Sequence, residues 1–373
     1  MKPFHPTEPP RRVLVICLRR LGDTLLSTAL IRSLRSAWPG CRIDVLVPAA
    51  SAPVLAGNPD IDGVITEPAQ GGALGKWRLV VRLCRRYDLA ISTLYNDRPH
   101  LYALIAGRCR VNVVPEPHGP GARWKRFFSS GWAVLELGAR HAVDQYLVLA
   151  DVLGLVRVSE VVAPSTADTT AVEAVLGGDW QRTPLAVLHP TAMYRYKGWT
   201  ADGWRGVIEH LTVQRGLRVV LSGGPGDAER RSVEALVKGL TPAAASRTVN
   251  AAGRWTFAEL AAVLRVARLY LGPDTSVTHL AAACGTPSVA LFGPSHPVAW
   301  GPWPNGYAQA GVSPWRLKLP LQHVENVWLV QGEGACVPCL QEGCDRHVDS
   351  HSACLDGLAA SRVNAVLDEV LAA

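Results

Sequence analysis

Short apolar runs rich in Val, Ile and Leu alternate with amphipathic helical patterns along most of this chain. The first run, Arg12–Leu18 (RVLVICL), is followed by a polar turn and then by the helical pattern LLSTALIRSLRSAWPG. Continuous apolar runs of this length are typical of strands buried on both faces of a parallel sheet. Residues 1–165 are therefore predicted to form a Rossmann-like α/β domain of βαβ units. Its later strands are expected at Ile43–Val47, Gly63–Thr66, Leu89–Thr93 and Arg110–Val114.

A second alternating series follows a small, polar segment, Val162–Thr183, which is interrupted by Gly and Pro and is the best candidate for a linker. Residues 180–335 are predicted to form a second Rossmann-like domain, and residues 336–373 a cysteine-rich loop with a terminal helix. That helix, Gly357–Ala373, is expected to pack back on the N-terminal domain. The strands of the second series are expected at Leu185–His189, Leu217–Leu221, Thr248–Asn250, Leu269–Leu271 and Ser288–Phe292.

Composition and charge narrow the class of protein. At 373 residues and 48% hydrophobic content, the chain is long enough for two domains with full cores. It has no apolar run of about 18 residues, and its first residues, MKPFHPTEPPRR, lack the apolar stretch of a signal peptide. A cytoplasmic protein is therefore expected. The formal net charge of +7 indicates an anionic partner: a phosphorylated substrate, a membrane surface or a nucleic acid.

The segment 271–295, LGPDTSVTHLAAACGTPSVALFGPS, is the most informative one. It predicts a buried strand, a turn, a short helix and another buried strand. Asp274 is the expected N-cap, and the amides of Thr275 and Ser276 lie at the positive end of the helix, which favours phosphate. His279 lies about one turn further along and can face the same ligand. Each residue alone is explained by a capped helix with a core histidine, but together they favour a nucleotide or sugar-phosphate pocket.

The turn RRLGDT, residues 19–24, lies at the carboxyl end of the first strand, where doubly wound sheets bind ligands. It has only one of the three glycines of a dinucleotide fingerprint, so a nicotinamide enzyme is disfavoured. Asp23 in this turn is either a helix cap or a general base that accepts a proton from an attacking hydroxyl.

Two turns of the second series also carry candidate chemistry. In HPTAMYRYKGW, residues 189–199, Thr191 can hydrogen-bond a phosphate oxygen, and Lys197 or Arg195 can neutralise a leaving diphosphate. The glycine-rich turn SGGPGD, residues 222–227, can admit a ribose close to the backbone, with Asp227 or Glu229 contacting its hydroxyls. A tight turn with a helix cap explains this last segment equally well.

In this order and spacing, these segments resemble glycosyltransferase family nine, the lipopolysaccharide heptosyltransferases. The resemblance is carried by RVLVICLRRLGDTLLSTALIRSLRSAWP, LHPTAMYRYKGWTADGW and LGPDTSVTHLAAACGTPSVALFGPS. It implies a GT-B fold of two facing Rossmann-like domains, with the acceptor on the N-terminal one and the nucleotide sugar on the C-terminal one. It also implies an inverting transfer, without a cofactor, of heptose from ADP-L-glycero-D-manno-heptose to the inner core of lipopolysaccharide at the cytoplasmic face of the inner membrane.

The same resemblance implies roles for single residues. Asp23 would be the catalytic base, and Thr191 and Lys197 would hold the diphosphate. Many relatives have glycine where this chain has Ser276, which bears on the identity of the donor. The residues that would line the donor sugar and its phosphates are Asp274, Thr275, Ser276 and His279.

Basic residues supply candidate contacts for an anionic acceptor. The segment RWKRFF, residues 123–128, mixes cations with aromatic rings, as suits an anionic lipid headgroup region. By composition alone it would also suit single-stranded nucleic acid, or an exposed loop with buried aromatic anchors. No nucleic-acid partner is expected, because charge and this one segment are its only support. The candidate acceptor contacts are Arg19, Arg20, Arg98, Arg123, Lys125 and Arg126.

Four cysteines near the C-terminus follow the pattern C-x2-C-x4-C-x9-C. A C-x2-C pair with two further cysteines is typical of a structural metal site, here for zinc or iron, although the spacing is not that of a standard finger. Reduced, packed thiols explain the pattern equally well. The pattern is also similar to that of heptosyltransferases of type III. The candidate ligands are Cys336, Cys339, Cys344 and Cys354.

The leading hypothesis is therefore a heptosyltransferase that adds the third, branching heptose of the core. An alternative within the same class is transfer of heptose or another sugar to a different acceptor, such as a protein or capsule. A different class, a non-catalytic protein that binds a sugar nucleotide, would keep the pocket without the reaction.

Overall fold

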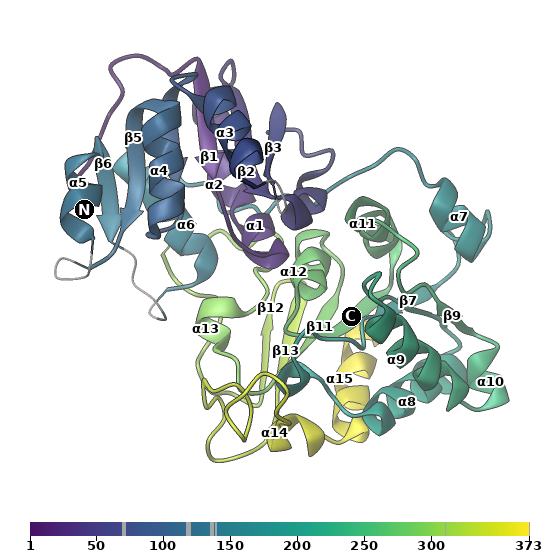
Figure 1. The fold of residues 1–373 in the computed structure, drawn as a ribbon. Helices are drawn as coiled ribbons and strands as arrows, with labels where there is room; N and C mark the ends of the chain where they lie inside the picture. Colours follow the sequence, from purple (N-terminus) through teal and green to yellow (C-terminus); the bar gives the residue numbers. More distant parts are fainter. Residues whose placement is uncertain (69–71, 117–120, 135–137, 139, 310, 373) are drawn as a thin grey trace. The chain divides into compact units, whose positions relative to one another are not determined.

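The computed structural model of the chain describes residues 1–68, 72–116, 121–134, 138, 140–309 and 311–372. These residues divide into two compact units, each built on its own sheet (Figure 1). The first unit comprises Met1–Pro164 and Ala308–Ser313, and the second comprises Ser165–Tyr307 and Pro314–Ala373. Within the residues that the structure describes, no helix combines the length and the apolar character needed to cross a lipid bilayer.

The first unit contains a six-stranded parallel sheet in the order β3-β2-β1-β4-β5-β6. Its central strand, β1, is buried from Val13 to Ile16, as the uninterrupted apolar run predicts. The strands are β1 Arg12–Ile16, β2 Arg42–Pro48, β3 Gly63–Glu67, β4 Tyr87–Ser92, β5 Gly107–Val114 and β6 Gly131–Val134. The helices are α1 Leu21–Leu26, α2 Thr28–Ala37, α3 Gly72–Leu83, α4 Asp97–Ala106, α5 Ala122–Phe127 and α6 Ala142–Val152.

The helical pattern after β1 is divided into two helices at Ser27. The hydroxyl of Ser27 donates to the carbonyl of Thr24 at 2.7 Å, and the hydroxyl of Thr28 donates to that of Leu25 at 2.6 Å. Hydroxyl groups that bond back to the preceding turn compete with the regular helical ladder. The chain therefore forms the short α1, which carries Asp23, followed by the longer α2.

The second unit contains a seven-stranded sheet in the order β12-β13-β11-β10-β7-β8-β9, in which only the pairing of β12 with β13 is antiparallel. Its strands are β7 Leu185–Leu188, β8 Arg218–Leu221, β9 Thr248–Asn250, β10 Leu269–Pro273, β11 Ser288–Phe292, β12 Leu321–Val324 and β13 Val327–Gln331. Its helices are α7 Thr170–Leu176, α8 Ala201–Glu209, α9 Asp227–Lys238, α10 Pro242–Ala245, α11 Phe257–Val266, α12 Ser276–Ala283, α13 Pro297–Trp300, α14 Ala353–Asp356 and α15 Ala360–Ala372.

The C-terminal helix corrects one expectation from the sequence. It was expected to return to the N-terminal domain, but α15 packs against α8 in the second unit. Its apolar face, which includes Val363 and Leu367, is buried in the core of that unit. On its polar side Asp368 lies 2.7 Å from Nε2 of His210 and accepts a hydrogen bond from Arg215. The apolar face of α15 and the hydrogen bonds of Asp368 thus both attach this helix to the second unit.

The expected linker is also shorter than the sequence indicates. The division between the units falls at Pro164, and the residues that follow belong to the second unit. They form α7, whose Ala171 carbonyl accepts a hydrogen bond from the indole of Trp255 at 3.2 Å. Trp180, also within the expected linker, is buried. A segment of small and polar residues thus still folds where a few apolar side chains anchor it.

Candidate functional site

An ion pair lies at the carboxyl ends of β7 and β10 in the second sheet. Asp274 follows β10 directly, and Lys197 lies in a short 3-10 turn, Arg195–Lys197, after β7. The Lys197 ammonium is 2.6 Å from Oδ2 of Asp274. The carboxylate is buried, whereas a quarter of the lysine side chain is exposed. The pair therefore holds a cation at the edge of the sheet where parallel α/β proteins bind their ligands.

The charges around Asp274 keep it ionised. Burial alone would raise the pKa of Asp274, but the charges of Lys197 and His279 outweigh it. Hydrogen bonds from Lys197 and Ser295 act in the same direction, so the pKa lies below its ordinary value. A fixed carboxylate thus orients the lysine ammonium at this edge of the sheet.

The structure corrects the expected cap of α12. Asp274 is not the N-cap: Thr275 holds that position with an extended backbone, and α12 begins at Ser276. The turn is fixed by the Thr278 hydroxyl, which donates to the carbonyl of Pro273 and lies 2.9 Å from the hydroxyl of Tyr270. The first amides of α12 therefore lie beside the Lys197–Asp274 pair, at the positive end of the helix. His279 is buried one turn further along.

Thr191 lies nearby but has a different partner from the one expected. Its hydroxyl donates to Oε2 of Glu229 at 2.8 Å, and the amide of Gly224 donates to the same oxygen at 2.8 Å. Nδ1 of His189 is 3.0 Å from the Ser222 hydroxyl, and burial lowers the pKa of His189. The imidazole is therefore neutral at pH 7. Thr191 and the Gly224 amide thus hold the Glu229 carboxylate, which is a hydrogen-bond acceptor.

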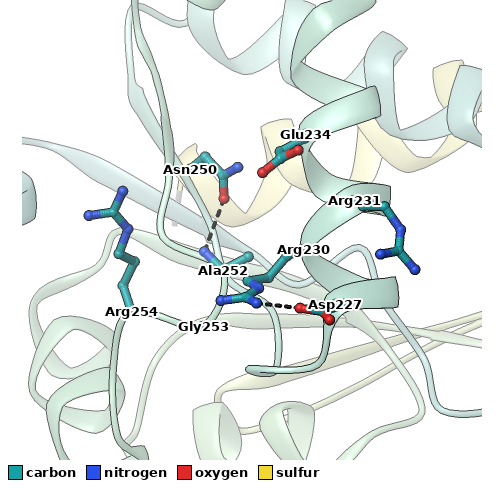
Figure 2. Close-up of a pocket in the computed structure, with 8 residues that line it drawn as sticks. All are labelled: Asp227, Arg230, Arg231, Glu234, Asn250, Ala252, Gly253 and Arg254. Atoms are coloured by element: carbon teal, nitrogen blue, oxygen red, sulfur yellow. Dashed lines mark hydrogen bonds and ion pairs between the residues drawn. The ribbon is translucent and has the colours of Figure 1, made fainter.

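A polar cavity of about 500 Å³ borders the glycine-rich turn, between the first turns of α9 and the loop after β9 (Figure 2). Asp227, one of two expected ribose contacts, is ion-paired with Arg230 in this cavity. The other lining residues are not among the candidates from the sequence. Four of the lining residues could have been found from their spacing, which places them on one face of α9. They are Asp227, Arg230, Arg231 and Glu234. The cavity is lined by Asp227, Arg230, Arg231, Glu234, Asn250, Ala252, Gly253 and Arg254.

In the first unit, Asp23 is the third residue of α1 and does not cap it, because the N-cap position is Arg20. Its Oδ1 accepts hydrogen bonds from Arg19 at 2.9 Å and from the hydroxyl of Tyr146 at 3.3 Å. Burial, followed by the charge of Asp23, raises the pKa of Tyr146 well above its ordinary value, so its hydroxyl stays protonated. Two donors thus hold one carboxylate oxygen. Tyr146, from α6, is a contact that only the fold reveals.

The other basic residues differ in what they can offer to an anion. Arg98 is largely exposed and lies 3.5 Å from Glu67, and Arg20 and Arg123 are exposed. Arg126 lies over the ring of Trp132, 4.5 Å from its centroid. Lys125 was expected to contact the acceptor, but its side chain is buried. Its ammonium lies 2.8 Å from Asp97 and donates to the carbonyl of Tyr95. It therefore ties α5 to the turn before α4.

The four C-terminal cysteines do not form a ligand set in the structure. They are free thiols, and the described residues contain no group of three or more His, Cys, Asp or Glu side chains that could hold a metal ion. Cys336 and Cys344 are exposed. Burial, together with the three neighbouring thiols, raises the pKa of Cys354 to about 11.

The cysteine-rich loop contacts the segments that hold the ion pair. The hydroxyl of Ser352 donates to the carbonyl of Tyr196 at 2.6 Å, and Asp356 lies 3.4 Å from Arg195. The loop also approaches the segment after β11 so closely that a Cβ on Gly293 would lie 2.7 Å from Leu355. The loop therefore supports the Lys197 turn from the side.

Comparisons with known proteins identify the family of the chain. A family model described as "Glycosyltransferase family 9 (heptosyltransferase)" matches residues 121–320. The chain is 28% identical to lipopolysaccharide heptosyltransferase 3 of Escherichia coli K12 over 317 residues, which cover 82% of this chain and 89% of that protein. It is 26% identical to lipopolysaccharide heptosyltransferase 2 of Salmonella typhimurium, over 77% of this chain and 84% of that protein.

A solved structure shows the same fold. The structure of E. coli ADP-heptose lps heptosyltransferase II matches with a TM-score of 0.72 at 19% identity, covering 97% of this chain and 98% of that one. Two Rossmann-like units with parallel sheets are the architecture of the GT-B fold. The family match covers more than half of the chain and includes Lys197, Glu229 and Asp274. The chain therefore belongs to glycosyltransferase family 9, the heptosyltransferases, and is a glycosyltransferase.

Proposed function

We propose that this enzyme transfers heptose from ADP-L-glycero-D-manno-heptose to the inner core of lipopolysaccharide and adds the third, branching heptose. The observation that carries the proposal is the Lys197–Asp274 ion pair beside the first turn of α12. A cation and a positive helix end are suited to the diphosphate of a nucleotide sugar. The name of the E. coli K12 relative, a heptosyltransferase 3, supports the acceptor position.

The second unit would hold the donor. The diphosphate would accept hydrogen bonds from Lys197 and from the first amides of α12, with Thr275, Ser276 and His279 beside the sugar. Glu229, fixed by Thr191 and the Gly224 amide, has a carboxylate that can accept hydrogen bonds from ribose hydroxyls.

The chemistry would be a single displacement with inversion. Asp23 would take the proton of the attacking acceptor hydroxyl as its oxygen bonds to the anomeric carbon of the heptose. The bond from that carbon to the diphosphate breaks at the same time, and ADP leaves with the electron pair. Lys197 and the helix end would stabilise the developing charge without a metal ion. Arg19 and Tyr146 would hold the carboxylate of Asp23 in position.

The acceptor would be met at the cytoplasmic face of the inner membrane. Arg19, Arg20, Arg98 and Arg123 are the basic residues that remain candidates for contacts with core phosphates, and Arg126 is a weaker one because it stacks on Trp132. Lys125 is withdrawn from this set, since its ammonium is buried and paired.

A separate proposal concerns the cysteine-rich loop. We infer from the spacing of Cys336, Cys339, Cys344 and Cys354 that the loop binds a structural zinc or iron ion, with no part in the transfer. The thiols do not form a ligand set in the structure, so binding would have to draw them together. Elemental analysis of protein purified without a His-tag tests this. About one metal ion per chain is expected, and metal-free, folded protein would contradict it.

The position of the added heptose is tested in cells. Mass spectrometry of lipopolysaccharide from cells lacking the protein should show the loss of a single heptose and of any group that the branch carries. Restoring the gene should restore that mass, whereas a gene encoding Asp23→Asn should not. Loss of more than one heptose would indicate an earlier position in the core, and an unchanged core would point to another acceptor.

A further inference from the structure

Helix α3 of the first unit is apolar on two faces. On the inner face, Leu79 and Leu83 are buried in the cluster that includes the β1 residues Leu14 and Ile16. On the outer face, Leu74, Trp77 and Val81 are 60%, 62% and 51% exposed. Their spacing of three and four residues places them in one stripe along the helix. The outer stripe is therefore not part of the core of its own unit.

The outer stripe lies among basic residues. From Gly72 to Arg86 the chain has five cations and no acidic residue. All five side chains are exposed. On a helical projection, Arg78 lies directly beside the stripe, and Arg82 follows Arg78 on the same side. The five residues are Lys76, Arg78, Arg82, Arg85 and Arg86.

The neighbouring helix extends the apolar surface. Helix α4 packs against α3, and its Leu101 is 48% exposed. Figure 1 shows α3 and α4 next to each other over the first sheet. By contrast, the basic and aromatic segment of α5 has Lys125 buried and Arg126 stacked on Trp132. Helix α3 thus presents more exposed cations beside exposed apolar side chains than α5 does.

We propose that the outer face of α3 docks on an anionic lipid bilayer. Trp77, Val81 and Leu74 would enter the boundary between headgroups and acyl chains, and Arg78 and Arg82 would bind lipid phosphates. A helix with an apolar stripe beside Lys and Arg is the kind that lies in the plane of a membrane interface. The five cations make pairing with a second copy of the same face unfavourable, since two-fold contact would bring like charges together.

This inference rests on the proposed function, because an enzyme that modifies the core of a membrane-anchored glycolipid has to work at the bilayer. The outer face of α3 would be the surface that contacts the bilayer. The surface would hold the first unit, which carries Asp23, at the membrane, where the acceptor is located.

The test is co-sedimentation of purified protein with vesicles of phosphatidylcholine and phosphatidylglycerol, and with vesicles of phosphatidylcholine alone. The wild-type chain should bind the anionic vesicles, and added salt should weaken binding by screening. Arg78→Gln with Arg82→Gln should lower the partition coefficient about 30-fold, since each cation near an anionic surface contributes about five-fold. Trp77→Ser with Val81→Ser should lower it by about ten-fold or more.

The matched control is Phe127→Ser, which removes an even more exposed aromatic side chain from α5 and should leave vesicle binding unchanged. All variants should keep wild-type transfer to a soluble, delipidated core acceptor. If the wild type shows no transfer to this acceptor, the proposed function is contradicted but the docking surface is not. The docking proposal is overturned if the wild type does not bind anionic vesicles, or if both α3 variants bind as well as the wild type. It is also overturned if the variants only dissociate a dimer of the protein.

Discussion

At the scale of single residues, the Lys197–Asp274 pair links donor binding to stability. Replacing Lys197 by Met leaves a buried carboxylate without its cation, which we expect to lower the free energy of unfolding by about 3 kcal/mol. It should also raise the KM for ADP-heptose, because the diphosphate loses a donor. Urea unfolding and steady-state kinetics measure the two effects. The double variant Lys197→Met/Asp274→Asn should regain much of the stability but none of the donor affinity.

The same pair predicts a dependence of stability on pH. The folded-state pKa of Asp274 is lowered from its ordinary value of 3.8, so its contribution to stability is fully present above that value. The contribution is lost as the pH falls through the lower folded-state pKa. The difference in unfolding free energy between wild type and Asp274→Asn should therefore be constant from neutral pH to about pH 5 and shrink below about pH 4. A difference that grows on acidification would contradict this account.

The partners of the site residues could be predicted from the sequence only in part. Asp274 follows β10 directly, and Lys197 and Asp23 lie in the segments after β7 and β1, so the pattern of the chain locates all three near the carboxyl ends of strands. The N-cap assigned to Asp274 was wrong, because the lysine that takes its carboxylate lies 77 residues away. Likewise Thr191 and Tyr146 depend on partners, Glu229 and Asp23, that only the folded chain brings near.

At the scale of elements, the cysteine-rich loop supports the turn that carries Lys197. Ser352→Ala removes the hydrogen bond to the Tyr196 carbonyl, and we expect the KM for ADP-heptose to rise about five-fold while kcat is nearly unchanged. Ser352→Thr keeps the hydroxyl and should restore the KM. Steady-state kinetics of the two variants make the comparison. Equal losses of kcat in both variants would show a general effect on folding instead.

The elements that could be predicted share a physical cause. Strands β1, β2, β7, β10 and β11 are buried on both faces, and their apolar runs mark them clearly in the sequence. Strand β6 was not anticipated, because its short run, Gly131–Val134, gives no clear period. The division of the first helical pattern at Ser27 depends on hydroxyl hydrogen bonds that periodicity does not reveal.

At the scale of the whole molecule, the proposed chemistry is divided between two units. The Lys197–Asp274 pair, Glu229 and the polar cavity belong to the second unit, whereas Asp23, Arg19 and Tyr146 belong to the first. Two domains and a GT-B fold could be predicted from the alternating pattern and the family resemblance. The packing partner of α15 could not be predicted, because an amphipathic pattern indicates that one face of a helix is buried but not which surface covers it.

This division predicts that donor binding and catalysis respond separately to substitution. The most direct test of the account is transfer of heptose from ADP-heptose to a truncated lipopolysaccharide core by wild type and Asp23→Asn, with ADP affinity measured by calorimetry on the same samples. The variant is expected to lose about 10²- to 10⁴-fold in kcat and to bind ADP as the wild type does. An Asp23→Asn variant that transfers heptose at the wild-type rate would contradict this expectation.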